Sequence, residues 1–184
     1  MLHLGCGRKR DLSGYPITLP ADVDLVNLDA DPSLEPDVVC RLGEQPIPLP
    51  SDSIDLAVAW HVLEHIGTQG ETARWFAFWE DLYRVLTPNG ALVFESPYYT
   101  SIWAWSDPTH SRVISEHSFV FFNQDAYRIP GSAISPYRVR CDFHYGVSPS
   151  MPKGWALVAD ADNEGSSMIR GCVVARKPFR GWWE

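Results

Sequence analysis

Three residues in the segment WHVLEHI have the types and the spacing that can hold a metal ion. His61, Glu64 and His65 form the pattern H-x-x-E-H, in which two histidines of one helix bind zinc and the glutamate activates a water molecule. His61 directly follows a strand-like run, so His65 lies only one turn into any helix, and the sequence supplies no convincing third ligand. We therefore predict no metal site, assign Glu64 and His65 to the turn into the next helix, and keep a zinc hydrolase as an alternative.

A second group of residues could bind a nucleoside. Gly5-Cys6-Gly7 lets the backbone approach a ligand without obstruction from a Cβ atom. Asp29 ends a later strand-like run and offers a carboxylate to both hydroxyls of a ribose. Alone, the glycines fit a tight turn and Asp29 fits a cap. Because ligands of open α/β sheets bind at the carboxyl ends of the strands, these residues and His61 together favour a nucleoside-type cofactor.

A third group of residues could remove a proton from a substrate. In the segment DPTHSR, His110 could take a proton as a general base, and Asp107 could orient it or act as the base itself. The alternative is that Asp107 to His110 is only a capped turn. Aromatic residues just before this segment could wall an acceptor pocket or could cover the core; they are Tyr98, Tyr99, Trp103 and Trp105.

These groups are positioned by strands and helices that alternate along the chain. Apolar runs predict strands at residues 2–4, 23–29, 38–42, 54–60 and 91–95. Apolar residues at helical spacing predict an amphipathic helix at residues 70–86. This alternation is typical of the α/β class with a mostly parallel sheet.

Two further features define the predicted sheet. Gly14, Pro16 and Pro20 are spaced too closely for a normal helix, so a loop is expected to follow the first strand. Two later runs, at residues 137–147 and 168–175, are expected to close the sheet as an antiparallel pair. The fold class predicted is therefore a mostly parallel α/β sheet with a C-terminal antiparallel hairpin and its first helix reduced to a loop.

The order of these motifs resembles that of class I S-adenosylmethionine-dependent methyltransferases. The resemblance rests on LHLGCG, on VNLDADPSLEPDVVCRLGEQPIPLPSDSIDLAVAWHVLEHI and on LYRVLTPNGALVFESP. These stretches are most similar to a small bacterial group, methyltransferase type 11-like, in which a glycine-containing loop replaces the first helix. The likeness covers residues 2–97, with a looser echo at residues 107–112. It implies a Rossmann-like sheet, S-adenosyl-L-methionine as cofactor and S-adenosyl-L-homocysteine as product.

The resemblance also implies roles for individual residues. It assigns ten residues to the cofactor: Leu4, Gly5, Cys6 and Gly7 at the methionine part, Asp29 and Ala30 at the ribose, Arg41 and Leu42 at the adenine, and Trp60 and His61 near the sulfonium. The sequence departs from the family pattern at Lys9, which stands in place of the third glycine of the first loop. No helix precedes the first strand, so a partner subunit, a second copy or the aromatic loop is expected to cover the pocket.

Length and composition indicate the number of domains, the class of partner and the compartment. We expect one domain, residues 1–184, with a cofactor-binding half at 1–97 and an acceptor-side half at 98–184. A net charge of −8 argues against nucleic acid as a partner. No stretch has the length and apolarity of a membrane span. Four separated cysteines fit a reducing, cytoplasmic compartment.

The expected function is methyl transfer to a small-molecule or glycan-type acceptor, and the glycan part rests on family analogy. The alternative is a non-catalytic protein that binds the cofactor or serves as a scaffold on the same fold.

Overall fold

The computed structural model describes residues 1–15, 17, 23–132, 134–145, 158–161 and 167–181. Within these ranges the chain forms one sheet with the strand order β3-β2-β1-β4-β5-β8-β6, and β7 pairs with β8. The strands are β1 (Leu2–Leu4), β2 (Val26–Asp29), β3 (Val38–Val39), β4 (Ile54–Trp60), β5 (Leu86–Pro97), β6 (Phe143–Tyr145), β7 (Val158–Ala161) and β8 (Ser167–Ala175).

The sheet has a parallel part and an antiparallel part, as predicted. Strands β1 to β5 are parallel, with β1 at the centre of the switch in strand order. Strand β8 runs antiparallel to β5 and to β6, which confirms the predicted closing pair. Strand β7 pairs with the other end of β8 and was not predicted. Its four residues, VADA, are too few to give a clear alternation.

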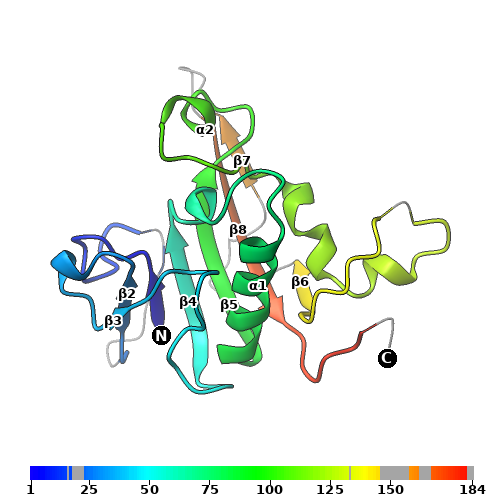
Figure 1. The fold of residues 1–184 in the computed structure, drawn as a ribbon, viewed down its shortest axis with the longest axis horizontal. Helices are drawn as coiled ribbons and strands as arrows, with labels where there is room; N and C mark the ends of the chain where they lie inside the picture. Colours follow the sequence, from blue (N-terminus) through cyan, green and yellow to red (C-terminus); the bar gives the residue numbers. More distant parts are fainter. Residues whose placement is uncertain (16, 18–22, 133, 146–157, 162–166, 182–184) are drawn as a thin grey trace.

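One long helix covers the face of the sheet that is turned toward the viewer in Figure 1. Helix α1 (Ala73–Val85) lies in front of β5 and β8. Its buried residues recur at helical spacing, and Trp79 is fully buried. The Trp79 ring stacks on Phe122, with ring centroids 4.7 Å apart, and meets Phe143 edge-on. The core therefore joins the parallel part of the sheet to its antiparallel part.

The remaining helices are short. They are α2 (Trp103–Ser106) and four 3-10 segments: η1 (Pro32–Leu34), η2 (Leu63–His65), η3 (Glu116–Phe122) and η4 (Ala126–Arg128). No helix of the described residues is long and apolar enough to cross a membrane. The described residues between β1 and β2 contain no helix, which confirms that a loop follows the first strand.

The connection after β4 differs from the expectation. Glu64 and His65 lie in η2, and α1 begins only at Ala73. The turn at WHVLEHI therefore does not lead directly into the helix. His61 adopts a left-handed backbone conformation, with φ +53°, which breaks the strand and sends the chain sideways across the carboxyl ends of β1 and β4. Such conformations are costly for residues other than glycine and are concentrated at functional sites.

Candidate functional site

A cavity of about 300 Å³ opens at the carboxyl ends of β1, β2 and β4. Small-molecule sites typically have volumes of ~300–1,000 Å³. Parallel strands bring these ends to one edge of the sheet, so residues distant in the sequence share the wall. The lining residues are Gly5, Leu28, Asp29, Ala30, Cys40, Arg41, Leu42, Glu44, His61, Val62, His65 and Ile66.

Six of the ten predicted cofactor residues line this cavity, namely Gly5, Asp29, Ala30, Arg41, Leu42 and His61. The other four do not. Leu4 is fully buried, and the buried Cys6 directs its thiol to the Gly7 carbonyl. Trp60 stacks on Tyr15, with ring centroids 4.7 Å apart. Cofactor contacts of these residues stay a prediction.

Six lining residues were not predicted: Leu28, Cys40, Glu44, Val62, His65 and Ile66. Leu28 directly precedes Asp29, and Cys40 directly precedes Arg41, so their positions at strand ends could have indicated them. Val62 and Ile66 are buried residues of the η2 turn. No sequence signal distinguishes them from ordinary core residues.

Gly5 and Asp29 shape the floor of the cavity. Gly5 has φ +59°, and a Cβ atom there would lie 2.5 Å from Val62 Cγ2, so only glycine fits. The Asp29 carboxylate is held by two backbone amides, with Gly7 N 2.8 Å from Oδ2 and Asp31 N 3.0 Å from Oδ1. Each carboxylate oxygen has a further lone pair. The carboxylate is thus oriented and can accept two more hydrogen bonds.

Two carboxylates hold the His61 ring at the β4 end of the cavity. Nδ1 lies 3.3 Å from Glu64 Oε1, and Nε2 lies 3.1 Å from Glu95 Oε1. The hydrogen bond to Glu64, and then that to Glu95, raise the pKa of His61 to about 9, so the ring is a cation at neutral pH. A doubly protonated imidazole has no lone pair. His61 is therefore not arranged as the zinc ligand of a peptidase.

Glu95 is the second carboxylate of this arrangement. Burial pushes the pKa of Glu95 upward, but hydrogen bonds from His61 and Arg170 outweigh burial and lower it. The charges of His61 and Arg170 are thus compensated within the structure.

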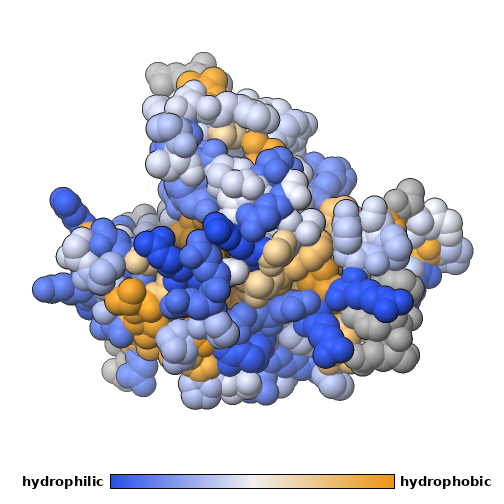
Figure 2. All heavy atoms as spheres, in the orientation of Figure 1, coloured by the Kyte–Doolittle hydropathy of each residue, from blue (hydrophilic) through white to orange (hydrophobic). Residues whose placement is uncertain are grey.

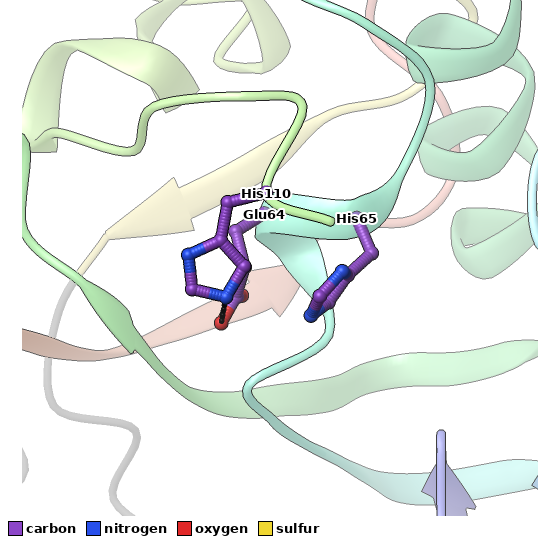
Figure 3. A group of neighbouring side chains, drawn as sticks. All are labelled: Glu64, His65 and His110. Atoms are coloured by element: carbon purple, nitrogen blue, oxygen red, sulfur yellow. Dashed lines mark ion pairs between the residues drawn. The ribbon is translucent and has the colours of Figure 1, made fainter. Parts of the chain in front are cut away.

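Glu64 lies at the centre of a second cluster, with His65 and His110 (Figure 3). Its carboxylate is 1% exposed, and Oε1 lies 3.9 Å from His110 Nε2. The two imidazole rings meet edge-on, with centroids 4.8 Å apart. His65, which the sequence assigns to a turn, lines the cavity and faces His110, 45 residues later in the chain.

The loop that carries His110 is a capped turn that is bound tightly to η2. Asp107 Oδ1 accepts hydrogen bonds from the amide and the hydroxyl of Thr109. Asp107 Oδ2 lies 3.7 Å from His110 Nε2. Asp107 thus caps the turn that carries His110, and His110 Nε2 lies 3.9 Å from Glu64 Oε1. The catalytic roles of both residues stay a prediction.

Exposed aromatic residues flank this loop. Tyr99, Trp103 and Trp105 are 46%, 51% and 70% exposed. They lie on or beside α2, which stands above the carboxyl ends of β4 and β5 (Figure 1). In Figure 2 this tip of the molecule is mostly pale blue to white, with a few hydrophobic residues among them. Tyr98 is less exposed and donates a hydrogen bond to Glu116. Three of the four aromatic residues therefore do not serve as covering for the core.

Comparison with known proteins places this site in a family. The family model described as "Methyltransferase domain" matches residues 2–94, the segment that forms the cavity. No curated protein gave a significant match.

The fold is shared with several solved structures. A SAM-dependent methyltransferase from Archaeoglobus fulgidus is 15% identical, with a TM-score of 0.54, over 94% of this chain and 84% of its own. The YcgJ protein of Bacillus subtilis is 12% identical, with a TM-score of 0.54, over 96% and 91%. A Haloferax volcanii protein, solved in complex with the Trm112 methyltransferase activator, is 14% identical, with a TM-score of 0.56, over 95% and 81%.

Proposed function

The chain belongs to the methyltransferase domain family, as a class I S-adenosylmethionine-dependent methyltransferase, and we propose that the cavity at the carboxyl ends of β1, β2 and β4 binds S-adenosyl-L-methionine. The observation that carries this proposal is the Asp29 carboxylate, which two backbone amides hold at the cavity wall. When bound, the cofactor supplies an electrophilic methyl group.

The residues of the cavity fit such a cofactor in three respects. Gly5 lines the cavity with backbone alone, because a Cβ atom there would collide with Val62. Asp29 has lone pairs for two ribose hydroxyls. The apolar side chains of Leu28, Leu42 and Ile66 can pack against the faces of an adenine ring. In this proposal residues 1–97 form the cofactor-binding half of one domain, and residues 98–184 form its acceptor side.

The acceptor would bind beside His61, between the cavity and the loop of residues 107–112. His110 Nδ1 is 2.7 Å from the Trp103 carbonyl, so Nδ1 is the donor and Nε2 keeps a lone pair. This nitrogen could accept the proton of an oxygen acceptor, with Asp107 stabilising the cation that forms.

A small molecule or a glycan component is the acceptor class that we propose. The exposed faces of Trp103 and Trp105 support it, because aromatic rings pack well against sugar rings. The net charge of −8 argues against nucleic acid. We place this reaction in the cytoplasm.

A partner subunit or a second copy of the chain would complete the site. The cavity is open to solvent, and Trp103 and Trp105 of α2 are 51% and 70% exposed. One structural neighbour was solved with a methyltransferase activator protein, which supports a cover of this kind.

Calorimetric titration with S-adenosyl-L-homocysteine tests the proposal. We expect one molecule to bind per chain, and S-adenosyl-L-methionine to compete with it. Absence of detectable binding of both compounds, by a folded protein at millimolar ligand, would overturn the proposed function and favour a scaffold role.

A further inference from the structure

We propose that Glu64, His65 and His110 form a binding site for one divalent transition-metal ion at the rim of the cofactor cavity. One possible ligand atom from each residue lies within 4.8 Å of the others. Two imidazoles and one carboxylate are a donor set that suits first-row ions such as Zn²⁺, Fe²⁺ and Mn²⁺. Figure 3 shows the two rings side by side, with the Glu64 carboxylate against the ring of His110.

Both histidines are held in the tautomer that metal binding requires. His65 Nδ1 lies 3.1 Å from the Thr109 carbonyl, and His110 Nδ1 lies 2.7 Å from the Trp103 carbonyl. A carbonyl oxygen can only accept, so each Nδ1 carries a proton, and the tautomer with its lone pair on Nε2 is the one that this geometry selects. Histidine ligands of metals commonly make this second hydrogen bond to a backbone carbonyl.

Glu64 is oriented in the same way. Its Oε2 accepts a hydrogen bond of 2.7 Å from the Ser96 hydroxyl, which leaves Oε1 directed toward His110 Nε2. A buried carboxylate is stabilised by a cation close to it. Oε1 also contacts His61 Nδ1 at 3.3 Å. An ion would therefore share or displace this contact, and the contact of His61 to Glu95 would remain.

The backbone holds the two parts of the site together. Ser111 N and Arg112 N both lie 3.0 Å from the Glu64 carbonyl oxygen. The Arg112 side chain donates to the carbonyls of Ile66, Thr68 and Glu71. Ligand atoms around one zinc ion lie about 3.3 Å apart, so ligand atoms now up to 4.8 Å apart must approach one another by as much as about 1.5 Å to close the cluster. The loop is anchored at Glu64 itself, so side-chain rotations can supply most of this approach.

The ion would have open coordination positions, because three protein ligands leave at least one position free. Resting on the proposed function, these positions would take hydroxyl oxygens of the acceptor. A metal-bound hydroxyl loses its proton to solvent more readily than a free one. In the ion-loaded protein the Nε2 lone pair of His110 would be used by the metal, so solvent would take the proton that His110 is proposed to accept when no ion is bound. Acceptors with two neighbouring oxygen atoms would then be favoured, since they can occupy two positions.

Calorimetric titration of tag-free, chelator-treated protein with Zn²⁺ and with Mn²⁺ tests the site. We expect one ion of at least one metal per chain with a dissociation constant in the micromolar range or below. His65→Ala and His110→Ala should each weaken binding at least 30-fold. Glu64→Gln keeps the shape of the side chain and should weaken binding similarly. His117→Ala is the matched control, because its ring is on the surface and outside the cluster, and it should leave binding unchanged.

His61→Ala separates this site from the zinc arrangement of the H-x-x-E-H pattern, and it should retain ion binding. Failure of both metals to bind stoichiometrically would overturn the proposal, as would binding that survives both His65→Ala and His110→Ala, or is lost in His61→Ala. Each variant is also titrated with S-adenosyl-L-homocysteine. That titration does not depend on the ion. A protein that binds S-adenosyl-L-homocysteine but no metal would therefore overturn the metal site alone, and a protein that binds metal but no S-adenosyl-L-homocysteine would overturn the proposed function alone.

Discussion

The two sides of the site are built differently. On the cofactor side, backbone groups from adjacent strand ends form the floor, and the key carboxylate of Asp29 is held by amides only two to 22 residues away. On the acceptor side, His110 reaches Glu64 through a loop that begins beyond β5, and aromatic side chains stand in solvent. Cofactor binding should therefore depend on a few local contacts, and acceptor handling on the anchoring of one loop.

Asp29→Ala should give the largest effect of the substitutions, a loss of cofactor affinity that is confined to the cofactor side. The change removes the partner of two backbone amides and of two proposed ribose hydroxyls. Hydrogen bonds to charged groups contribute about 1.5–3 kcal/mol each, so affinity for S-adenosyl-L-homocysteine should fall about 100-fold or more by calorimetry. Asp31→Ala is the control, because its carboxylate caps η1 only. Equal affinity in Asp29→Ala and wild type would contradict the assignment.

Arg112→Ala should weaken the anchoring of the loop on the acceptor side. It removes hydrogen bonds to three backbone carbonyls and a contact with the Trp75 ring at 4.5 Å. We expect a loss of about 2–3 kcal/mol of unfolding free energy, which lowers the melting temperature by roughly 4–12 °C for a chain of this size. Metal affinity should fall as well.

The control for Arg112→Ala is Arg74→Ala, which removes only half-exposed ion pairs with Glu44 and Glu71. Arg74→Ala should lower the free energy of unfolding by less than about 1 kcal/mol. Similar melting temperatures for the two variants would show that the loop does not depend on Arg112.

Gly5→Ala and Gly7→Ala sharpen the account of the cavity floor. Both glycines have positive φ, so each substitution should lower the free energy of unfolding by about 1–2 kcal/mol. Only at Gly5 would the new methyl group collide with Val62; at Gly7 no atom lies within 4 Å. Gly5→Ala should therefore weaken binding of S-adenosyl-L-homocysteine about tenfold more than Gly7→Ala. Adding Val62→Ala should restore part of the difference, and no restoration would contradict the proposed collision.

Trp105→Ala should give the smallest effect on stability. Its ring is 70% exposed, so thermal unfolding should change by less than about 0.5 kcal/mol. Trp79→Ala removes a fully buried ring from the core and should cost about 3–5 kcal/mol. A large destabilisation by Trp105→Ala would show that the aromatic loop is part of the core, contrary to its proposed role toward the acceptor.

The difference between the cofactor side and the acceptor side also explains which parts of the structure could be predicted from the sequence. The parallel strands and the cavity residues Gly5, Asp29 and His61 were predictable, because each follows a strand-like run and parallel strands end at one edge. The meeting of Glu64 with His110 was not, because it depends on the path of the loop after β5. No period or spacing in the sequence reports that path.

Two smaller differences have physical reasons. His61 lines the cavity, but its contacts with both Glu64 and Glu95 could not be predicted without the β4–β5 pairing. His65 was assigned to a turn into the helix, whereas η2 is followed by a further loop before α1. His61 has a left-handed conformation there, which only a few per cent of residues other than glycine adopt, so a pattern of residue types does not locate it.

A crystal structure of the complex with S-adenosyl-L-homocysteine tests the central claim most directly. We predict the adenosine in the cavity between Asp29 and Leu42, with the ribose hydroxyls bonded to the Asp29 carboxylate. A ligand bound elsewhere on the chain, or in this cavity without any contact to Asp29, would contradict the claim.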